Sequence, residues 1–460
     1  MASIVVAMTT SNGRSVAIIG AGQTGVTAAL GLLDIGFDVT IHSERDRDAL
    51  RNDVPATGTA LIFGHAQRAE ESLGLNTYLA SAPTSTGQSV RVRDGDTEAI
   101  AFDGWFDGAR GVAVDTRLKA DDRLALFEKR GGRFEVGSVD PQRLDAIAAK
   151  ADLTVVATGR GGLSALFPVD TTRTVYDRPQ RTLLAFSVTG LGHGPDVFAH
   201  RGSGGGAHHA FTVVAGQGES FWGPYLHKDA GPSWAFLGWA HPGSDWAARF
   251  GTVTDAASAL KVATGLHRDY IDWDLPEVSR FRVIEEDPHS WLTGAVTQVV
   301  REGVGHTAGG HPVLALGDTA ISYDPIGGQG AQGGLIHAAA LVHKAAAHEG
   351  PFDTAWLTES FEEFYDTRGR AAQRVTQLFL ADPDFAEYGN LFFAAASASP
   401  RFAGRLFGLL DDPRRFESVT SEAAAKALIT EFAEEPAADV LARFEPAGAF
   451  ERSGLLSPAA

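Results

Sequence analysis

The stretch VAIIGAGQTG, residues 16–25, decides the fold of this chain. Its first four residues form a short apolar run rich in β-branched side chains, which predicts a buried parallel strand. Residues 26–33 are rich in Ala and Leu and predict a helix, and residues 38–41, DVTI, predict a second strand. A strand, a glycine-rich turn, a helix and a strand in this order predict a βαβ nucleotide-binding unit.

The three glycines of the turn have separate tasks in such a unit. Gly20 permits the tight turn, Gly22 lets the backbone approach a pyrophosphate, and Gly25 lets helix and strand pack closely. The helix that starts with Gln23 and Thr24 offers free N–H groups and the positive end of its dipole to the phosphates. A structural glycine-rich turn without a nucleotide is the alternative interpretation.

The end of the second predicted strand departs from the usual pattern. An acid that binds a ribose hydroxyl normally ends this strand, but Ser43 occupies its place and Glu44 follows one residue later. Either side chain is able to hydrogen-bond the ribose. We therefore expect the adenosine end of the ligand to be held less firmly than usual.

A second glycine-rich stretch lies far downstream, at residues 314–334, LALGDTAISYDPIGGQGAQGG. A single ligand long enough to reach both glycine-rich turns explains the pair, and FAD is such a ligand. Asp318 is expected to accept hydrogen bonds from its ribityl or pyrophosphate region, with a helix cap as the alternative. N–H groups of a helix predicted over 332–343 would stabilise negative charge on the reduced ring. The residues expected beside the isoalloxazine ring, where glycine permits close backbone approach, are Pro325, Gly328, Gln329, Gly330 and Ala331.

The remaining patterns predict an α/β fold with a Rossmann-type FAD-binding domain, a β-sheet substrate domain and a C-terminal helical region. The FAD-binding domain is expected to be discontinuous and to comprise residues 14–55, 100–178 and 300–349. The substrate-binding β domain is expected over residues 56–99 and 179–299, where apolar runs lie between Gly and Pro turns. Residues 56–110 show no clear periodicity. Residues 350–460 are rich in Ala, Leu, Phe and Glu and predict helices.

Composition bounds the class of function. With 460 residues, 44% hydrophobic and 21% charged, the chain resembles a globular enzyme of two or three domains. A formal net charge of −18 argues against a nucleic-acid or anionic-membrane partner. The chain has no cysteine, and His208-His209 and His337…His343 lack metal-ligand spacing, so no metal is expected.

The first 13 residues contain Ile4-Val5-Val6-Ala7 but neither a basic region nor a cleavage site, so we expect no signal peptide. No apolar run reaches the roughly 18 residues of a membrane span. The predicted localisation is cytoplasmic.

Four motifs carry a resemblance to a known family: GAGQTG (20–25), VDTRL (114–118), DLTVVATGR (152–160) and the stretch over 314–334. Together they resemble the p-hydroxybenzoate-hydroxylase-type flavoprotein monooxygenases, which have a glutathione-reductase-like FAD-binding domain. Within that superfamily the chain is most similar to the oxygenase component of styrene and indole monooxygenases. VDTRL, EKRGGRF (128–134) and DRPQR (177–181) occur in that subgroup in the same order and at similar spacing.

The resemblance implies FAD as the cofactor and O₂ as a co-substrate, with a C4a-hydroperoxide of the reduced flavin as the oxygen donor. It implies epoxidation of a small aromatic alkene of the styrene or indole type, and sulfoxidation as a further activity. Such chemistry needs no acid–base residue, but it needs a dry, apolar pocket. By analogy with the matching arginine of the family, Arg117 is expected to reach the flavin or its phosphates. A surface helix salt bridge is the alternative for Arg117.

The departures from the family pattern concern the source of electrons. The wider hydroxylase family has an Asp-Gly motif linked to FAD and NADPH binding, where this chain has Thr158-Gly159. Ile321 replaces the usual histidine of the GD motif, and Gln332 replaces an asparagine after the glycines. These departures imply that the cofactor arrives as FADH2 from a separate NAD(P)H-dependent flavin reductase. A single-component hydroxylase using NAD(P)H directly and a flavin-binding protein without catalysis stay open, as does a homodimer.

Substrate-binding residues are expected in the β domain and around residues 56–65. Gly58, Ala60 and Ile62 stand where the styrene and indole groups carry their distinguishing residues, and this set matches neither group. The aromatic candidates are Phe211, Phe221, Trp222, Trp234, Phe236 and Trp239. Period-two spacing places Trp234 and Phe236 on one face of a strand. Plain sheet core is the alternative for each ring, so the identity of the substrate stays open.

Overall fold

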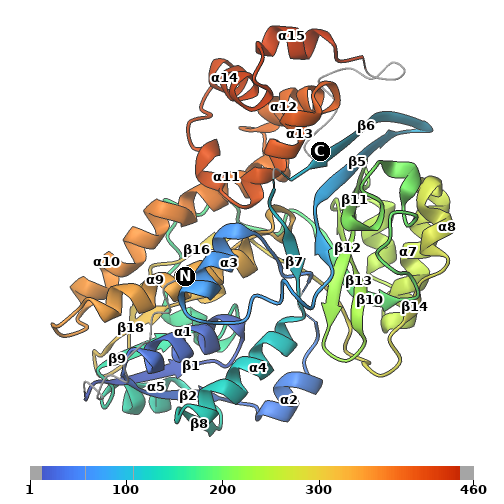
Figure 1. Ribbon diagram of the computed structural model, residues 1–460. Coiled ribbons are helices and arrows are strands. Elements are labelled where there is room, and N and C mark those ends of the chain that lie inside the picture. Colours follow the sequence, from blue (N-terminus) through green and yellow to red (C-terminus); the bar gives the residue numbers. More distant parts are fainter. Residues whose placement is uncertain (1–12, 57, 107, 446–460) are drawn as a thin grey trace.

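The computed structural model describes residues 13–56, 58–106 and 108–445. Two sheets lie side by side, and a group of C-terminal helices lies above them in Figure 1. The first sheet, at the lower left, is surrounded by helices, and the second stands upright at the right. This arrangement confirms the predicted α/β fold with a Rossmann-type domain, a β-sheet domain and a C-terminal helical region.

The first sheet has six strands in the order β17-β18-β9-β1-β2-β8. The strands are β1 (Ser15–Ile19), β2 (Asp38–Ser43), β8 (Arg133–Val136), β9 (Leu153–Val156), β17 (Val304–His306) and β18 (Pro312–Ala315). Neighbours pair in parallel except β17, which pairs antiparallel with β18. β1 and β9 are buried almost throughout, as expected for parallel strands covered by helices. The carboxyl ends of β1, β9 and β18 therefore meet at one edge.

The helices around this first sheet belong to the nucleotide-binding half of the fold. They are α1 (Gln23–Asp34), α2 (Arg47–Asn52), α3 (Gly64–Ser72), α4 (Thr116–Lys129), α5 (Pro141–Ala148) and α9 (Gln329–Ala346). α1 packs against both α4 and α9. A Cβ at Gly31 would lie 2.7 Å from Val342 Cγ2, so a glycine is what lets α1 and α9 approach this closely. The helix predicted over 332–343 is confirmed, and it begins earlier, at Gln329.

The second sheet has eight strands, with the main path β14-β10-β13-β12-β11-β5-β6 and with β15 also paired to β10. The strands are β5 (Gly87–Asp94), β6 (Thr97–Trp105), β10 (Thr182–Thr189), β11 (His208–Val214), β12 (Gly218–His227), β13 (Gly231–Ala240), β14 (Arg282–Val283) and β15 (Trp291–Ala295). Pairing is antiparallel except between β5 and β11. The predicted domain boundary between residues 99 and 100 falls inside β6, because the whole β5–β6 hairpin continues this sheet.

Each face of the second sheet is covered by a different part of the chain. The α7 face contacts α6 (Asp245–Phe250), α7 (Ala256–Tyr270) and α8 (Leu275–Val278). The opposite face is called the Ile326 face, because Ile326, in the turn before α9, joins its apolar cluster. That cluster also contains Phe211, Phe221, Leu237 and Trp239 from the sheet and many apolar residues of the C-terminal helices.

The two faces divide the aromatic residues that were predicted to line the substrate pocket. Trp234 and Phe236 do share one face, as their spacing predicts, and Trp222 lies with them. That face is the α7 face, where these three rings pack as sheet core, because side chains alternate along a strand and every second residue points away from Ile326. Their assignment to the pocket stays a prediction. Phe211 and Phe221 lie on the Ile326 face, and their assignment stays a prediction.

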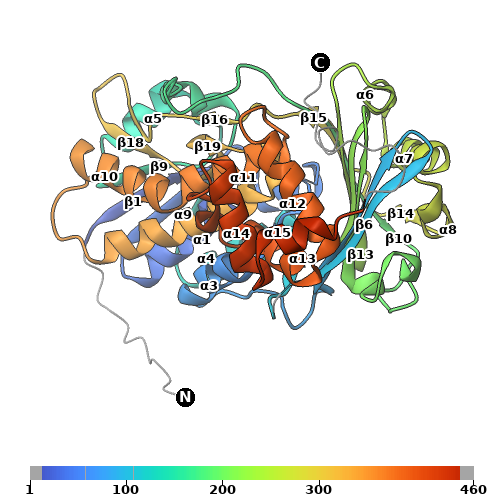
Figure 2. The ribbon, with the colours of Figure 1, turned by 90° about the horizontal axis from the view of Figure 1, so that it is seen from above.

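The C-terminal helices are α10 (Thr354–Phe364), α11 (Arg370–Phe379), α12 (Ala386–Ala398), α13 (Pro400–Phe407), α14 (Glu422–Ala433) and α15 (Ala437–Ala442), with a π-helical turn at Tyr365–Gly369. Of these helices, α11 to α15 lie over the junction between the two sheets, as the view from above shows, whereas α10 lies beside the first sheet (Figure 2). A Cβ at Gly104 would lie 2.8 Å from the backbone of Ala403, so β6 and α13 touch directly. The predicted helical character of residues 350–460 is confirmed for the part up to residue 445.

Two small sheets connect these parts. β3 (Leu61–Ile62) and β4 (Thr84–Ser85) both pair with β7 (Gly111–Ala113), and β16 (Val299–Val300) pairs with β19 (Ile321–Ser322). The small sheet of β3, β7 and β4 brings the segment around Leu61 between the two large sheets. Leu61 packs against the cluster that contains Ala113 of β7 and also against the apolar cluster of the Ile326 face.

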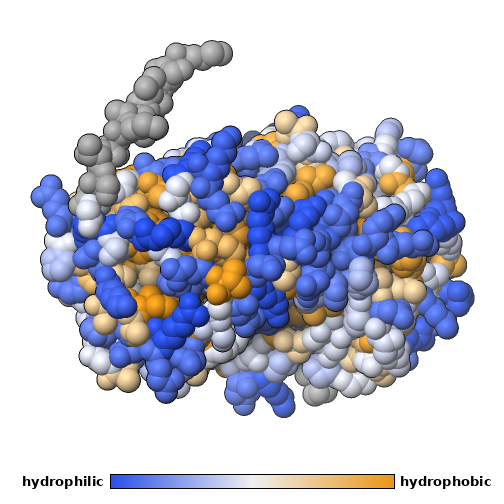
Figure 3. Space-filling model, turned by 90° about the horizontal axis from the view of Figure 1, so that it is seen from below, coloured by the Kyte–Doolittle hydropathy of each residue, from blue (hydrophilic) through white to orange (hydrophobic). Residues whose placement is uncertain are grey.

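The face of the molecule seen from below mixes hydrophilic residues with small, separate groups of hydrophobic ones (Figure 3). Within the described ranges, no helix combines the length and the apolar character that a membrane crossing requires. The N-terminal segment for which no signal peptide is predicted lies, up to residue 12, outside the described residues.

Candidate functional site

Three loops meet at the carboxyl edge of the first sheet. They follow β1, β9 and β18, which are neighbours in the sheet order, and they contain Gly20, Thr158 and Gly317. Thr319 Oγ1 donates a hydrogen bond of 3.0 Å to the carbonyl of Gly159, which ties the second loop to the third. The edge beyond the carboxyl ends of parallel strands is where open α/β sheets bind ligands.

The first loop has the geometry that its glycines predict. Gly20 has a φ of +114°, and a Cβ there would lie 2.4 Å from the carbonyl oxygen of Ala157. A Cβ at Gly25 would lie 2.2 Å from the carbonyl oxygen of Gly20, so only glycine lets α1 begin so close to β1. A Cβ at Gly22 would meet nothing within 4 Å, so this position faces open space, as an approach to a pyrophosphate requires.

The start of α1 is open to a ligand. Gly22 is its N-cap and provides no side-chain cap, so the first N–H groups of the helix keep their binding capacity. Gln23 is buried, and its backbone carbonyl accepts a hydrogen bond from Thr27. The side chain of Thr24 faces the third loop, because a Cβ at Gly317 would lie 3.1 Å from Thr24 Cγ2.

The two residues expected to bind a ribose differ in their surroundings. Ser43 Oγ is largely engaged locally, since it donates to the carbonyl of Arg45 and accepts from the N–H of the same residue. Glu44 is exposed and forms an ion pair with Arg45 at 2.6 Å. Glu44 is the residue with the freer side chain, and ribose binding by either one stays a prediction.

Asp318, in the third loop, has two arginines near it. Burial raises the pKa of its carboxyl group, and the positive charges of Arg160 and Arg301 act in the opposite direction. Burial also lowers the pKa of Arg301, against the attraction of Asp318. The helix-cap alternative does not describe Asp318, because Gly317–Thr319 is a short 3-10 turn with no side-chain cap.

Several buried polar atoms at this edge have no hydrogen-bond partner in the part of the chain that the structure describes. They include Thr158 Oγ1 and Arg301 Nη1. A hydroxyl and a guanidinium N–H suit a ligand rich in hydroxyl and phosphate oxygens, so the residues present fit FAD. Arg160 and Arg301 were not among the predicted site residues. Arg160 directly follows Thr158-Gly159 and offered a signal, whereas Arg301 reaches the site only through the β16–β19 ladder.

The turn of residues 324–328, here called the DPIGG turn, connects β19 to α9. Asp324 Oδ1 accepts a hydrogen bond of 3.0 Å from the N–H of Ile326, which fixes the short 3-10 helix Pro325–Gly327. Gly328 has a φ of +60°, in the region that favours glycine, and α9 starts directly after it without a side-chain cap. A Cβ at Gly330 would lie 3.7 Å from Asp318 Oδ1, so the start of α9 and Asp318 face each other.

Asp324 itself is an unusual group. It is buried, its Oδ2 has no hydrogen-bond partner, and burial raises its pKa to about 7. The hydrogen bond from Ile326 and the charge of Arg181 lower this pKa, whereas Glu219 raises it. Arg181 is held by Glu219 through two hydrogen bonds of 3.0 Å, so most of its charge is already paired.

Two glutamine side chains hold the DPIGG turn against the C-terminal region. Gln329 Nε2 donates to the carbonyls of Gly327 (2.8 Å) and Leu410 (3.1 Å). Gln332 Nε2 donates to the carbonyls of Gly328 and Leu410, both at 2.9 Å. Arg368 donates to Gln329 Oε1 at 2.8 Å. Gln329 and Gln332 are therefore structural clamps, and Ala331 and Gly330, half-buried beside them, stay predicted flavin contacts.

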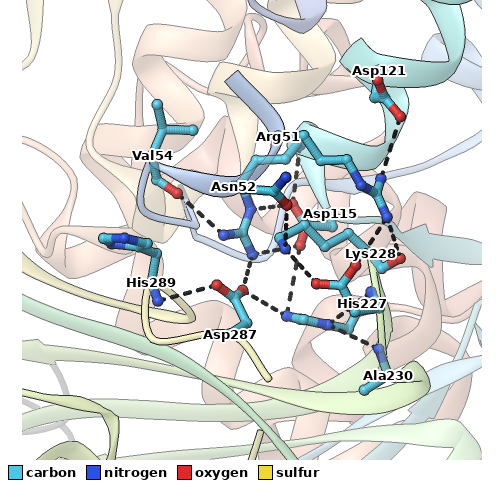
Figure 4. Close-up of polar contacts among 12 residues, drawn as sticks. Arg51, Asn52, Val54, Asp115, Asp121, His227, Lys228, Ala230, Asp287 and His289 are labelled. Carbon is cyan, nitrogen blue, oxygen red and sulfur yellow. Dashed lines mark hydrogen bonds and ion pairs between the residues drawn. The ribbon is translucent and has the colours of Figure 1, made fainter. Parts of the chain in front are cut away.

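Arg117 lies in a buried polar network between the two sheets. It donates to Asp115 at 2.8 Å, to Asp287 at 2.6 Å and to the carbonyl of Val54 at 3.1 Å. His227 also binds Asp287, at 3.0 Å, and Figure 4 shows these partners converging. The alternative of a surface salt bridge is wrong, because Arg117 and both acids are buried. A contact of Arg117 with the flavin stays a prediction.

One group in this network has the spacing of metal ligands: His227, Asp229 and Asp287. Both ring nitrogens of His227 are engaged, since Nε2 binds Asp287 and Nδ1 accepts from the N–H groups of Asp229 and Ala230. Lys228 pairs with Asp229 as well. Groups of the protein itself, such as the Lys228 ammonium group and the N–H groups of Asp229 and Ala230, thus already occupy these potential metal ligands.

The residues that were expected to distinguish substrates lie at the start of β3. Ile62 is fully buried in a cluster with Ala66, Tyr78, Val112 and Leu335. Ala60 has a φ of +45° and Gly58 a φ of +67°, and a Cβ at Gly58 would meet nothing within 4 Å. The turn at Gly58 and Ala60 is therefore the part of this segment with room beside it, whereas Ile62 fills the core.

The sequence of this chain is similar to those of several known proteins. A family model described as the styrene monooxygenase A substrate-binding domain matches residues 159–276, which contain β10 to β13 of the second sheet. The styrene monooxygenase StyA of Pseudomonas fluorescens is 25% identical over 380 residues, 80% of this chain and 85% of that protein. A StyA from another Pseudomonas species is 26% identical over 352 residues, 73% of this chain and 78% of its own length.

Solved structures share the fold. A 2-methyl-3-hydroxypyridine-5-carboxylic acid oxygenase has a TM-score of 0.56 and 17% identity, covering 85% of this chain and 97% of that one. The flavin-dependent brominase Bmp2 has a TM-score of 0.59 and 15% identity, covering 92% and 98%. The glycine-rich edge of the first sheet, the polar atoms left open there and these comparisons lead to one conclusion. The chain is a flavoprotein monooxygenase that uses FAD and is similar to the oxygenase component of the styrene monooxygenases.

Proposed function

We propose that this protein takes FADH2 from a separate NAD(P)H-dependent flavin reductase and uses O₂ to epoxidise an aromatic alkene of the styrene or indole type. Sulfoxidation of an aromatic sulfide is the further activity that we propose for the same site. The curated relatives support the epoxidation, because they are named styrene monooxygenases. When bound, reduced flavin supplies the activation of O₂ and the transfer of one oxygen atom.

One observation carries this proposal: the DPIGG turn contributes Ile326 to the apolar cluster of the Ile326 face. An aromatic substrate between that turn and the sheet would lie among apolar side chains such as Phe211 and Phe221. Oxygen transfer to a π-bond needs a positioned alkene and the exclusion of water more than it needs an acid and a base. An apolar pocket between the turn and the sheet would position the alkene and exclude water.

The chain's own residues then have distinct tasks around the cofactor. The N–H groups at the start of α1 would bind the pyrophosphate, and Asp318 and Arg301 would bind the hydroxyl and phosphate oxygens between the two glycine-rich turns. The DPIGG turn would lie against the ring, held in place by Gln329 and Gln332. Asp324 is the first residue of this turn, and burial allows its carboxyl group to hold a proton near neutral pH.

The source of electrons is the part of the proposal that rests on the sequence motif Thr158-Gly159. An acid at this position is linked to NADPH binding in the wider hydroxylase family, and Thr158 supplies a neutral hydroxyl instead. The proposed domain division assigns residues 14–55, 100–178 and 300–349 to FAD and the second sheet to the substrate. The β5–β6 hairpin belongs to the substrate side, since it continues the second sheet.

Product analysis tests the proposed reaction. The purified protein is mixed with chemically reduced FAD, O₂ and styrene, indole or thioanisole, and the products are separated by chiral chromatography. We expect an epoxide from an alkene, or a sulfoxide from thioanisole, with catalase present to remove free peroxide. Formation of hydrogen peroxide alone with every substrate would leave a flavin-binding protein without oxygenase activity.

The alternative enzyme is a single-component hydroxylase. It predicts that the purified protein with FAD and NADPH, but without a reductase, consumes NADPH faster when substrate is added. We expect no such stimulation, and we expect turnover to appear once an unrelated flavin reductase is added. Rapid, substrate-dependent NADPH consumption by the protein alone would favour the single-component enzyme.

A further inference from the structure

A buried histidine on the Ile326 face has no partner for either ring nitrogen. His209, in β11, is 1% exposed, and within residues 13–56, 58–106 and 108–445 neither its Nδ1 nor its Nε2 has a hydrogen-bond partner. Its strand neighbour Phe211 points to the same face, because alternate residues of a strand share a face. A buried polar atom without a partner is costly, and in native proteins it usually awaits a ligand or a water.

The surroundings of His209 are aromatic. Its ring centroid lies 4.8 Å from that of Phe221 and 5.8 Å from that of Phe106. A Cβ at Gly223 would lie 2.5 Å from the Phe221 ring and 3.2 Å from His209 Cδ2, so a glycine there makes room for both rings. Burial lowers the pKa of His209 to about 3, so the imidazole is neutral and presents one donor and one acceptor.

This aromatic group connects a surface groove to the DPIGG turn. Phe106 lines a groove of about 680 Å³ together with Trp105, Ala109, Arg110, Pro400 and Arg401. That volume is typical of a site for a small organic ligand. On its other side Phe106 contacts Phe63, with ring centroids 5.3 Å apart. The N–H of Phe63 donates to Gln332 Oε1, in the first turn of α9.

We propose that His209 is a specificity-determining residue that hydrogen-bonds a polar ring atom of the substrate, so that this enzyme prefers heteroaromatic substrates to pure hydrocarbons. The proposal rests on the proposed function for the presence of an aromatic substrate on the Ile326 face. A ligand that enters from the groove and displaces the Phe106 ring contacts the imidazole and the ring of Phe221 together. A hydrocarbon in the same place leaves both ring nitrogens of His209 unsatisfied.

Equilibrium binding to the enzyme loaded with oxidised FAD tests this without turnover. Three ligands share one fused-ring shape: indole has an N–H donor, benzofuran has an oxygen acceptor, and indene has neither. We expect indole or benzofuran to bind about 10-fold more tightly than indene, as one hydrogen bond to a buried polar group implies. Dissociation constants come from calorimetry or from changes in the flavin absorbance.

Variants separate recognition from structure. His209→Leu should weaken the preferred heteroaromatic ligand about 10-fold and leave indene within about 2-fold. His209→Gln, which keeps a donor and an acceptor, should restore part of the preference. The matched control is His267→Leu, since His267 is a buried histidine on the α7 face whose two nitrogens both have partners. This control should keep the preference of the wild type.

Equal affinity of all three ligands for the wild type, or equal weakening of all three by His209→Leu, would overturn the proposal. A shift of the His209 ring nitrogens in ¹⁵N NMR on adding indole, but not indene, would support it independently. The proposed function fails separately: if no epoxide or sulfoxide forms from any substrate, the binding ratios still report on His209.

Discussion

The two faces of the second sheet are built from the same strands, but they differ in how their buried polar side chains are hydrogen-bonded. On the α7 face, the indole N–H of Trp222 donates to His267 Nε2, and Trp234 donates to the carbonyl of Gly192. On the Ile326 face, His209 and the indole N–H of Trp239 have no partners among the described residues. On the α7 face, Trp246 Nε1 and Trp273 Nε1 lack partners there too. The unpaired imidazole of His209 supports the proposal that the Ile326 face receives a ligand.

Burial does not separate the two faces. Trp222 and Trp234 are 0% exposed on the α7 face, but Leu191 on that face keeps 8% of its surface accessible, as Phe221 and Ile326 do on the Ile326 face. The comparison teaches that aromatic content alone does not locate a pocket, because both faces are rich in aromatic rings.

The largest effect on the free energy of unfolding should come from replacing Trp222 and Phe221. These neighbours in β12 point to opposite faces of the sheet. Trp222→Ala should lower the free energy of unfolding by about 3–5 kcal/mol, because it leaves a large cavity in sealed core. Phe221→Ala should cost less, about 3 kcal/mol, because its ring is smaller and borders the face that we propose receives a ligand. Urea denaturation of the FAD-loaded protein measures both values. An equal loss for the two variants would remove the distinction between the faces.

Asp324 should make the Ile326 face sensitive to pH. Its folded pKa of about 7 is above the ordinary value of 3.8, so its stabilising contribution is complete below about pH 4 and lost as pH rises through 7. Asp324→Asn should therefore gain stability relative to the wild type between pH 4 and 8, by about 2–4 kcal/mol. Urea denaturation of the flavin-free protein at several pH values measures this difference. Parallel pH profiles for the two proteins would contradict it.

The two buried histidines offer a matched comparison. His267→Leu leaves the Trp222 N–H buried without a partner and should cost about 1–3 kcal/mol. His209→Leu removes two unsatisfied nitrogens, so it should leave the free energy of unfolding unchanged or raise it. Thermal unfolding monitored by circular dichroism ranks the two variants. A larger loss for His209→Leu would mean that its imidazole has a structural partner.

The smallest effect concerns two tryptophans in β13. Trp234→Phe removes the hydrogen bond to Gly192 and should cost about 0.5–1.5 kcal/mol more than Trp239→Phe, which removes an N–H without a partner. Both changes shorten the ring in the same way, so the difference isolates the hydrogen bond. Chemical denaturation with matched m-values is the appropriate measurement. A difference near zero would show that the two faces treat polar atoms alike.

The sequence predicts the parts of this protein that depend on local pattern. The βαβ unit around Gly20 and the strand that leads to Asp318 follow from short apolar runs and glycine spacing. The pocket could not be predicted in the same way, because β11 pairs in parallel with β5, a strand far away in the sequence. Residues 56–110 include the β5–β6 hairpin, in which the first half of β5 is buried on both faces, so that part shows no alternation of apolar and polar residues.

His209 shows where a usable signal was present. Its position next to His208 suggests only a metal ligand, and the spacing of the two histidines argues against that role. Period-two alternation from Phe211 already places His209 on the same face as that ring. What sequence could not supply was the absence of a partner, since that depends on Phe106 and Phe221 from two other strands and loops. Arg301 is a similar case, because its approach to Asp318 depends on the long-range pairing of β16 with β19.

The shared carbonyl of Leu410 has a consequence for biosynthesis. Gln329 and Gln332 both donate to it, and it lies 81 and 78 residues further along the chain. A ribosome releases the glycine-rich elements before Leu410, so the DPIGG turn lacks its clamp until the segment around Leu410 has emerged. The proposed contact of this turn with the flavin therefore forms only after Leu410 has left the ribosome.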